Sequence, residues 1–411
     1  MTEKLKCGLI GKTLGHSYSP QIHAELGDYS YSLFEMGEDE LAGFLRSDEF
    51  HGANVTIPYK IAVMPYLDEI SPEASRIGSV NTIVHTPDGK LVGYNTDYYG
   101  FGYMLGAAGI DVADKKVLVL GSGGASLTAR TLLRDRGARE VVVISRSGEN
   151  NYSNLGRHAD ADVIVNTTPV GMYPNNGDSP VSLDTFPKLT GVADIIFNPA
   201  KTALLLDAET RGIKCAGGLT MLVAQAKAAS EYFTGSRIDD AEIERITQKI
   251  ERQTKNIALV GMPGCGKSTV GKLIAQKTGR EFVDLDAVIT EKAGMPIPEV
   301  FAKYGEGYFR DLETAALAEV SKRSSLVIAT GGGTVIRPEN RRMLKQNSTV
   351  VFIKRNINDL PKDGRPVSQA NSLESLYKTR LPFYMDASDF EVELCNTPNQ
   401  SSDKILEVLG L

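Results

Sequence analysis

The sequence predicts an α/β protein with more than one domain. Short apolar runs alternate with polar segments of helical spacing along most of the chain, as in open α/β sheets. Two glycine-rich loops, Gly121–Ser126 and Gly261–Thr269, each follow an apolar run and precede a helical segment, which is the strand–loop–helix arrangement of ligand-binding sheets. With 411 residues, the chain exceeds what one hydrophobic core holds and predicts about two to three domains.

The composition excludes several classes of protein. Hydrophobic residues make up 42% and charged residues 23% of the chain, and the net charge is −6, so we expect no nucleic-acid or membrane partner. No apolar run approaches the roughly 20 residues that cross a bilayer, and the polar start predicts no signal peptide. Four widely spaced cysteines without a C-x-x-C pair argue against a zinc site and favour a cytoplasmic location. No feature specifies an oligomeric state.

The first predicted domain, residues 1–105, carries polar side chains at the ends of its predicted strands. After the strand Cys7–Ile10, Ser17 and Ser19 stand two residues apart, so an extended backbone would point both hydroxyls the same way. Two aligned hydroxyls suit a polar ligand. A serine before a helix is also an ordinary N-cap, and these residues alone favour the cap.

A second group of polar residues follows the strand within Gly52–Lys60, which Pro58 ends. Lys60 then lies at the carboxyl end of the strand, where open α/β sheets bind ligands. The segments Gly78–Thr82 and Gly93–Asp97 repeat small residues with Asn or Asp at a strand end, a pattern that singly is typical of turns. Together these segments would bring six polar residues around one small polyol: Lys60, Asn81, Asp97, Ser17, Ser19 and Thr56. A lysine paired with an aspartate can give a proton to a developing alkoxide.

The second predicted domain, residues 106–235, has the pattern of a dinucleotide-binding sheet. The apolar strand Lys116–Leu120 runs into Gly121–Ser126, where Ser126 replaces the third glycine of the dinucleotide fingerprint. The next strand, Glu140–Ile144, is followed by Arg146 where NAD-binding proteins carry an acidic residue. An arginine there accepts a 2′-phosphate, which favours NADP over NAD. A surface arginine without a role is the alternative.

Two helices close this half of the chain. Gln225 is the polar residue of a mostly apolar helix and is either a solvated edge or a ligand contact. The segment 236–252 carries Ile243, Ile246 and Ile250 at helical spacing and is expected to fold back on the first domain. A short linker then leads to a third domain at 256–411.

The third domain opens with a phosphate-binding loop. Gly261–Thr269 reads G-M-P-G-C-G-K-S-T between a strand and a helix, and its backbone N–H groups can surround a phosphate chain. Lys267 would reach the outer phosphates, and the Ser268 hydroxyl would bind Mg²⁺. We therefore expect this domain to bind a nucleoside triphosphate.

Polar residues farther along the third domain supply candidates for the remaining chemistry. Glu281–Leu285 is predicted as a strand from which Asp284 and Asp286 project to the same side, one near Mg²⁺ and one near an acceptor hydroxyl; a polar strand face is the alternative. Arg310 and Glu313 have the spacing of a helix ion pair. Thr330–Gly333 allows the backbone to approach a ligand closely, and Asp363–Pro366 lies in a stretch typical of a lid.

Residues 1 to about 250 resemble shikimate dehydrogenase. The resemblance rests on S-Y-S-P, G-A-N-V-T-I-P-Y-K, G-S-V-N-T, N-T-D-Y-Y-G, G-S-G-G-A-S, N-T-T-P-V-G-M, F-N-P and G-G-L-T-M-L-V-A-Q-A. It implies reduction of 3-dehydroshikimate with NADPH by the catalytic pair Lys60 and Asp97. It implies that the substrate is bound by Ser17, Ser19, Thr56, Asn81 and Gln225. It implies that the cofactor is bound by Gly121, Gly123, Gly124, Ala125, Ser145 and Arg146. Phe197 departs from the family, which usually has tyrosine there, and Ser145-Arg146-Ser147 replaces Asn-Arg-Thr.

Residues 256–411 resemble shikimate kinase, which transfers the γ-phosphoryl group of ATP to the 3-hydroxyl of shikimate. The resemblance implies that Lys267 and Ser268 hold phosphates and Mg²⁺, that Asp284 supports the metal, and that Asp286 holds the acceptor hydroxyl. It implies that the nucleotide is also bound by Gly264, Gly266 and Thr269. It implies that shikimate is bound by Arg310, Gly331, Gly332, Gly333 and Arg380. Arg365 is implied as the lid arginine that closes on the transferred phosphate. Val367-Ser368 departs from the usual leucines.

The two resemblances together predict a bifunctional enzyme, because the product of the first activity is the substrate of the second. The fold class is an open α/β substrate domain, a Rossmann-like NADP domain and a P-loop kinase domain with a parallel sheet. One alternative is a quinate/shikimate-type dehydrogenase fused to a kinase for another small polyol. The other is an inactive metabolite sensor, against which the presence of Lys60, Asp97, Lys267 and Asp286 argues.

Overall fold

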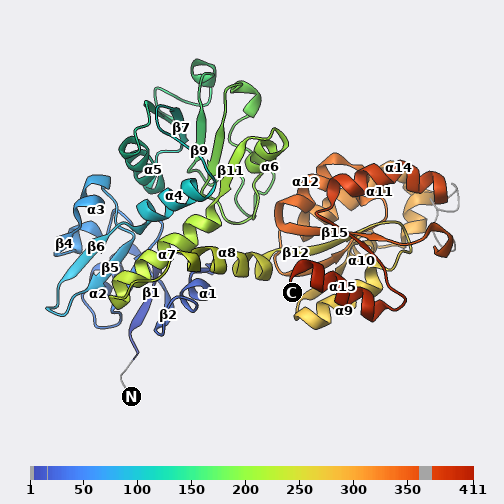
Figure 1. The fold of residues 1–411 in the computed structure, drawn as a ribbon, viewed down its shortest axis with the longest axis horizontal. Coiled ribbons are helices and arrows are strands. Elements are labelled where there is room, and N and C mark those ends of the chain that lie inside the picture. Colours follow the sequence, from blue (N-terminus) through green and yellow to red (C-terminus); the bar gives the residue numbers. More distant parts are fainter. Residues whose placement is uncertain (1–3, 16, 361–372) are drawn as a thin grey trace. The chain divides into compact units, whose positions relative to one another are not determined.

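The structure is a computed structural model that describes residues 4–15, 17–360 and 373–411. It contains three β-sheets flanked by helices (Figure 1). The chain divides into two compact units, each of which is described by itself. The first unit comprises residues 1–172, 178–197 and 207–250, and the second comprises residues 173–177, 198–206 and 251–411.

The first sheet is mixed, with the strand order β2-β1-β3-β5-β6-β4. Its strands are β1 (Lys6–Gly11), β2 (Ser30–Glu35), β3 (Gly52–Val55), β4 (Glu69–Ile70), β5 (Thr82–His85) and β6 (Leu91–Tyr94). The parallel pairs β1–β2 and β1–β3 place the ends of β1 and β3 at one edge, while β3 and β5 run antiparallel. The helices of this part are α1 (Ser19–His23), α2 (Glu38–Leu45) and α3 (Pro72–Ile77), with the 3₁₀ turn η1 (Met64–Tyr66).

The second sheet is parallel throughout, with the order β11-β10-β9-β7-β8. Its strands are β7 (Lys116–Leu120), β8 (Glu140–Ile144), β9 (Val163–Asn166), β10 (Gly191–Asp194) and β11 (Lys214–Gly217). The bounds predicted for β7 and β8 are confirmed, and β7 is buried along its whole length, as expected for a central parallel strand. The helices are α4 (Thr96–Ala107), α5 (Gly124–Asp135), α6 (Ala203–Thr210) and α7 (Gly218–Thr234), with the 3₁₀ turns η2 (Leu155–His158) and η3 (Leu183–Thr185).

Helix α8 (Ala241–Thr254) is strongly amphipathic. Its Ile243, Ile246 and Ile250 are buried with residues of α1 and α7. On its polar side, Arg245 and Lys249 each form an ion pair with Glu25, at 2.9 and 2.7 Å. The helix therefore packs on the segment around α1, as its apolar spacing predicted.

The third sheet is also parallel, with the order β13-β14-β12-β15-β16. Its strands are β12 (Asn256–Val260), β13 (Glu281–Asp284), β14 (Leu326–Ala329), β15 (Ser348–Lys354) and β16 (Phe390–Glu393). The helices are α9 (Lys267–Thr278), α10 (Leu285–Ala293), α11 (Ile297–Val320), α12 (Pro338–Asn347), α14 (Leu373–Ala387) and α15 (Pro398–Leu409), with the 3₁₀ turns η4 (Thr334–Ile336) and η5 (Ile357–Asp359). Helices α9 and α15 cover one face, and α11, α12 and α14 cover the other (Figure 1). The predicted α/β fold class is thus confirmed.

One predicted element of this domain is wrong in detail. Glu281–Leu285 was expected to continue as a strand that carries both aspartates on one side, but β13 ends at Asp284 and α10 begins at Leu285. The Asp284 side chain accepts a hydrogen bond from the Asp286 N–H at 3.1 Å and caps the helix. An aspartate satisfies the exposed N–H groups of a helix start, and this local bond overrides the strand pattern.

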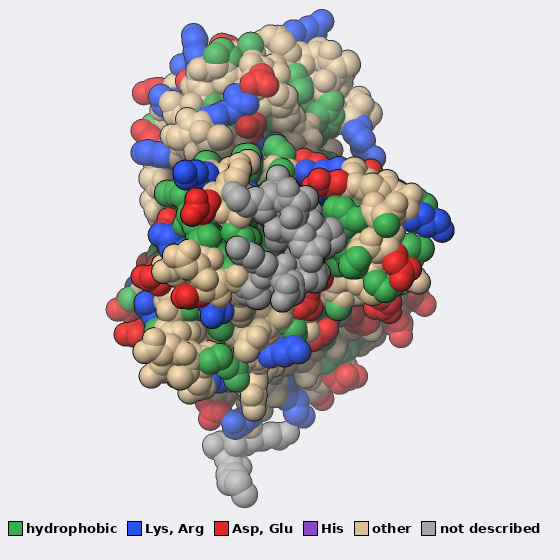
Figure 2. Space-filling model, turned by 90° about the vertical axis from the view of Figure 1, so that its right-hand side faces the viewer, with side chains coloured by type: hydrophobic (Ala, Val, Ile, Leu, Met, Phe, Trp, Pro, Cys, Tyr) green, Lys and Arg blue, Asp and Glu red, His purple; other side chains and the backbone are tan. Residues whose placement is uncertain are grey.

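Charge is mixed on one face of the molecule. On the face that Figure 2 shows, Lys and Arg side chains are interspersed with Asp and Glu rather than gathered into one basic patch. Among the described residues, no helix is long and apolar enough to cross a membrane.

Candidate active sites

The first site centres on an ion pair at the ends of two structural elements. Lys60 lies in the turn after β3, and Asp97 lies in the first turn of α4. The Lys60 Nζ and Asp97 Oδ2 atoms are 2.5 Å apart, and their side chains are only 19% and 9% exposed. The N-terminus of a helix stabilises the negative charge of Asp97. The structure therefore brings the two predicted catalytic residues into direct contact.

A buried polar network beside this pair joins two further predicted residues through Thr96, the residue before Asp97. The Asn81 Oδ1 atom accepts from the Thr96 N–H at 2.7 Å, and the Asn81 side-chain amide donates to Thr96 Oγ1 at 3.0 Å. Thr96 Oγ1 in turn lies 3.4 Å from Gln225 Oε1. Gln225 is buried, so it is not a solvated edge. Sequence reasoning missed Thr96, whose only signal is its place directly before Asp97.

Helix α7 can bring Gln225 to this network because α4 carries a glycine at the crossing. A Cβ atom at Gly100 would lie 2.7 Å from the Met221 carbonyl oxygen and 3.0 Å from the Gln225 Cβ atom. Any other residue would push the two helices apart. Gly100 therefore sets the separation at which Gln225 reaches Thr96.

The serines of the first loop do not cap a helix in the way that the sequence favoured. Helix α1 begins at Ser19 with Tyr18 in the N-cap position, and no side-chain cap bond is formed. The Ser17 Oγ atom accepts from the Ser19 N–H at 3.2 Å, a bond ahead of the helix. Thr56 follows the neighbouring strand β3, and its N–H donates to the Ile10 carbonyl at 2.9 Å. The loop after β1 and the turn after β3 thus lie side by side.

Phe197 follows β10 and contacts the same loop. Its ring centroid lies 5.3 Å from that of Tyr18, with an angle of 55° between the ring planes. The position that departs from the family pattern is therefore next to Ser17 and Ser19, and it offers no hydroxyl.

The second glycine-rich loop has the geometry that a dinucleotide needs. Gly121 follows β7 with φ 103°, and a Cβ atom there would lie 2.9 Å from Thr167 Oγ1. Gly123 holds the N-cap position of α5, whose first residues, Gly124 and Ala125, have N–H groups that no helical carbonyl satisfies. This cradle at a helix N-terminus fits the pyrophosphate of NADP. The replacement residue Ser126 is fully buried, as close packing of the helix requires.

The residues expected at the 2′-phosphate follow the neighbouring strand. Ser145 and Arg146 come directly after β8, which pairs with β7 in parallel. The Ser145 N–H donates to the Asn150 carbonyl at 3.1 Å, and Arg146 is exposed. Parallel neighbours end at the same edge of the sheet, so Arg146 lies on the side of the glycine loop.

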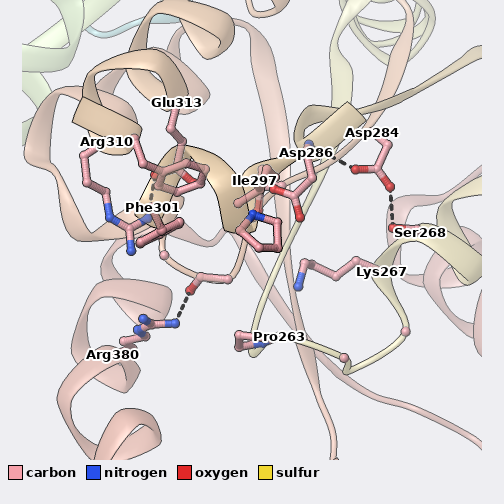
Figure 3. Close-up of a pocket in the computed structure, with 18 of the residues that line it drawn as sticks. Pro263, Lys267, Ser268, Asp284, Asp286, Ile297, Phe301, Arg310, Glu313 and Arg380 are labelled. Carbon is pink, nitrogen blue, oxygen red and sulfur yellow. Dashed lines mark hydrogen bonds and ion pairs between the residues drawn. The ribbon is translucent and has the colours of Figure 1, made fainter. Parts of the chain in front are cut away.

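A pocket of ≈ 470 Å³ forms the candidate site of the third domain (Figure 3). It lies at the carboxyl ends of β12, β13 and β14, closed from the sides by α11 and α14. Every described residue that was predicted for this site lines it: Gly264, Gly266, Lys267, Ser268, Thr269, Asp284, Asp286, Arg310, Gly331, Gly332, Gly333 and Arg380. The remaining predicted residue, Arg365, lies outside the described residues, as do the other residues of the expected lid.

The phosphate loop holds its lysine in a buried position. Lys267 Nζ donates to the carbonyl oxygens of Gly261 and Met262 at 2.9 and 3.0 Å. Gly264 and Gly266 have φ values of 77° and 106°, which side-chain-bearing residues rarely adopt. Positive charge and helix N–H groups thus meet at one end of the pocket, where they fit a chain of phosphates.

One hydroxyl group and one carboxylate group beside the loop fit Mg²⁺. Ser268 Oγ donates to Asp284 Oδ2 at 2.6 Å, and both groups are oxygen donors of the kind that Mg²⁺ prefers. Next to them, Asp286 lines the pocket with an exposed side chain. Partial desolvation by the surrounding protein and the negative charge of Asp284 raise its pKa, while Lys267 opposes this rise. A carboxylate with a raised pKa is a better proton acceptor.

The other end of the pocket carries two buried arginines (Figure 3). Arg310 Nη1 donates to Glu313 Oε2 at 2.7 Å, and Glu313 Oε1 accepts from Thr334 Oγ1 at 2.6 Å. Burial lowers the pKa of Arg310, but the charges of Glu313 and Glu306 outweigh it, so the pKa rises overall. Arg380 Nη1 donates to the Gly332 carbonyl at 3.2 Å. Two guanidinium groups in one pocket can bind a carboxylate.

Sequence reasoning missed two groups that hold these residues. Tyr384 Oη donates to the same Gly332 carbonyl at 2.5 Å, and its spacing of four residues from Arg380 on one helix was the available signal. Glu306 Oε1 lies 3.0 Å from Arg310 Nη2, again at a spacing of four.

Comparisons with known proteins agree with both resemblances. Residues 9–83 match the family model for the shikimate dehydrogenase substrate binding domain, and residues 263–410 match the model for shikimate kinase. The shikimate dehydrogenase (NADP(+)) of Clostridium beijerinckii is 39% identical over 267 residues, which cover 60% of this chain and 98% of that protein. The corresponding protein of Bacillus mycoides is 35% identical over 273 residues, which cover 60% of this chain and 97% of that protein.

Solved structures resemble the same part of the chain. A chorismate mutase/shikimate 5-dehydrogenase fusion protein from Clostridium acetobutylicum has a TM-score of 0.58 and 37% identity, and the match covers 61% of this chain and 98% of that chain. Shikimate 5-dehydrogenase from Thermus thermophilus, in complex with NADP(H) and shikimate, has a TM-score of 0.55 and 33% identity, with 60% and 99% coverage.

Proposed function

Because the chain belongs to the shikimate dehydrogenase family and its residues 263–410 match shikimate kinase, we propose that it is a bifunctional enzyme of the shikimate pathway. It reduces 3-dehydroshikimate to shikimate with NADPH and then phosphorylates shikimate at the 3-hydroxyl with ATP and Mg²⁺. The observation that carries this proposal is that one chain holds both the Lys60–Asp97 pair and a pocket lined by the kinase residues. The product of the first reaction is the substrate of the second.

In the reduction, Lys60 acts as the proton donor. NADPH, when bound, would supply a hydride to the carbonyl carbon of the substrate. Lys60 gives its proton to the oxygen as negative charge develops there, and Asp97 holds the ammonium group in place. Asn81, Gln225 and the hydroxyls of Ser17, Ser19 and Thr56 orient the substrate. The network through Thr96 supports these roles because it fixes Asn81 and Gln225 beside Asp97.

In the phosphorylation, Asp286 holds the acceptor hydroxyl and takes its proton. ATP supplies the phosphoryl group, and Mg²⁺ neutralises phosphate charge when bound. Lys267 and the N–H groups of the loop bind the phosphates, while Ser268 would hold the metal and Asp284 would orient Ser268 and support the ion. Arg310, Arg380 and the glycines at 331–333 bind shikimate at its carboxylate end. The positions of these residues around one pocket support the assignment.

We propose the domain boundaries that the sequence suggested. A substrate domain spans 1–105 and is completed by the helix at 236–252, an NADP domain spans 106–235, and a kinase domain spans 256–411. The three sheets of the structure support this division. A cytoplasmic location is also proposed, on the spacing of the four cysteines.

Product analysis tests the function directly. The purified protein receives 3-dehydroshikimate, NADPH, ATP and Mg²⁺, with Lys60→Ala and Lys267→Ala variants alongside. We expect shikimate 3-phosphate from the parent, no reduction by Lys60→Ala, and shikimate accumulation with Lys267→Ala. Unused NADPH in the parent reaction would refute the dehydrogenase assignment and favour an inactive sensor. Accumulation of shikimate in the parent reaction would refute the assignment of shikimate as the phosphoryl acceptor of the kinase half.

One observation favours a second candidate for the dehydrogenase half. Phe197 removes a hydroxyl beside the substrate loop, so a dehydrogenase with quinate as its preferred substrate is the alternative. The ratio of kcat/KM for shikimate to that for quinate decides between the two.

A further inference from the structure

Arg310 is held by two glutamates that differ in their surroundings. Glu313 is buried, with its side chain 1% exposed, and its carboxylate is also bonded to Thr334. Glu306 has a side chain that is 56% exposed, and its Oε1 atom lies 3.3 Å from Arg310 Nε and 3.0 Å from Nη2. Glu313 is therefore a fixed part of the pocket wall, whereas Glu306 reaches the guanidinium from the solvent side.

The geometry of the guanidinium shows which of its edges remains for a ligand. A guanidinium offers two forks that bind a carboxylate with two parallel bonds, one at Nε and Nη2 and one at Nη1 and Nη2. A Cβ atom on Gly333 would lie 2.4 Å from both Nη1 and Nη2 and 2.7 Å from Cζ. The equal distances place this Cβ atom midway between the two terminal nitrogens and beyond them, on the side of the guanidinium away from Nε. The Gly333 backbone, one bond farther away, thus closes the Nη1–Nη2 fork, and Glu306 occupies the remaining fork.

The backbone around Glu306 permits movement. Gly305 interrupts the helical conformation of α11 with φ 80° and ψ 174°, and Gly307 follows Glu306 directly. Apart from its chain neighbours and the backbone of its own helix, a Cβ atom added at either glycine would meet no atom of the described residues within 4 Å, so no other described element packs against the backbone on either side of Glu306. Glu306 therefore stands at a break in the helix rather than inside a rigid turn.

We propose that Glu306 imitates the carboxylate of the acceptor in the substrate-free kinase site and is displaced from Arg310 when the acceptor binds. This inference rests on the proposed function, in which Arg310 binds the carboxylate of shikimate. Glu313 keeps the charge of the guanidinium paired throughout, and exchange of one carboxylate for another on the Nε–Nη2 fork keeps those donors hydrogen-bonded as well, since a buried donor without a partner is costly. The exchange also favours acceptors with a carboxylate, because a neutral group cannot replace Glu306 on the fork.

The proposal predicts that removal of the Glu306 charge strengthens acceptor binding. A ligand that must displace an internal competitor has a higher apparent Kd, equal to its intrinsic Kd divided by the fraction of sites from which the competitor is absent. Glu306→Gln should therefore lower the KM for shikimate by about two- to fivefold, the range that corresponds to an exposed ion pair, with little change in kcat or in the KM for ATP. Asp311→Asn is the matched control, because Asp311 is an exposed carboxylate on the same helix that pairs with Arg337 instead.

The experiment measures ADP formation by the full chain with shikimate, ATP and Mg²⁺ in the absence of NADP, so that the dehydrogenase half does not turn over. Shikimate methyl ester serves as a neutral acceptor for which Glu306→Gln should bring no gain. An unchanged or raised KM for shikimate in Glu306→Gln, or an equal gain with the ester, overturns the proposal. If the parent forms no shikimate-dependent ADP, the proposed kinase function itself has failed, which is a separate result.

Discussion

The Lys60 ammonium and the Asp97 carboxylate are in direct contact, although 37 residues separate them in the sequence. Lys60 follows β3 and Asp97 begins α4, so the contact depends on the sheet that brings β3, β5 and β6 together. Burial of a charged ammonium group costs free energy unless a group of opposite charge lies beside it, and Asp97 is that group. The pair therefore both holds a proton for transfer and fixes the atom from which it leaves.

Removal of either partner should strongly slow the dehydrogenase reaction in both directions without affecting phosphorylation. We expect Lys60→Ala and Asp97→Asn to lower shikimate-dependent NADP reduction by about 10²–10⁴-fold, the range of general acid–base catalysis. Kinase activity of the same preparations serves as the control for folding. An Asp97→Asn variant with nearly full dehydrogenase activity would contradict the role of the pair.

A second prediction concerns Asp286, whose side chain is exposed but lines the pocket. Partial desolvation by the surrounding protein and the charge of Asp284 raise its pKa. The native state then holds the proton more strongly than the unfolded chain does. Stability is lost as pH rises from the ordinary pKa of an aspartate to the raised value, and the loss persists above it. Asp286→Asn should therefore be more stable than the parent at pH 7, and this advantage should shrink at low pH.

The same substitution should lower kinase activity by about 10²–10⁴-fold, because the acceptor loses its base. Thermal unfolding of the kinase half at pH 7 and at pH 4 measures the stability, and ADP formation measures the activity. A less stable Asp286→Asn at pH 7 would show that the carboxylate supports the fold instead.

The kinase pocket was largely predictable from the sequence because its residues follow strands directly. The phosphate loop, Asp284 and the glycines at 331–333 all lie at carboxyl ends of parallel strands, which meet at one edge. The start of α10 was not predictable by alternation, because the cap bond from Asp284 to the Asp286 N–H ends the strand.

Contacts between distant segments were beyond the sequence patterns. Thr96 joins Asn81 to Gln225, which is 129 residues away, only because α4 and α7 cross closely at Gly100. Tyr384 meets the Gly332 carbonyl across 52 residues. Periodicity describes one element at a time, so bonds of this kind depend on the packed structure.

The metal site yields a third prediction. Asp284 orients the Ser268 hydroxyl through a bond of 2.6 Å, and loss of a group that orients a metal ligand typically costs about 10- to 100-fold in metal affinity. Asp284→Asn should therefore raise the Mg²⁺ concentration for half-maximal kinase activity by about this factor. Ser268→Thr, which keeps a hydroxyl, should remain near the parent, and an equal loss in both variants would point to distortion of the loop.

Phe197 provides a fourth prediction for the dehydrogenase half. Its ring contacts Tyr18, between the two serines proposed to bind substrate. A hydroxyl added by Phe197→Tyr should lower the KM for shikimate by about two- to tenfold, the gain that one hydrogen bond brings, with a smaller change for NADP. Phe197→Leu is the control for ring packing. An unchanged KM in Phe197→Tyr would place this position outside hydrogen-bonding reach of the substrate.

The last prediction concerns stability at acidic pH and rests on His23. This side chain is fully buried, stacks on Tyr31 at 3.9 Å and bonds Tyr29 through Nδ1 at 2.7 Å. Burial lowers the pKa of His23 from its ordinary 6.5 to about 3. The unfolded chain therefore takes up a proton below pH 6.5 that the native state refuses until about pH 3.

As the pH falls through this interval, the native state should lose up to about 1.4 kcal/mol of stability per pH unit on account of His23. His23→Gln removes the titrating group, so the stability difference between parent and variant should narrow steadily from pH 6.5 to pH 4. Denaturant unfolding of the dehydrogenase half at several pH values measures the difference, in which the other histidines cancel. A difference that stays constant with pH would mean that water reaches His23 and that the imidazole is protonated in the native state.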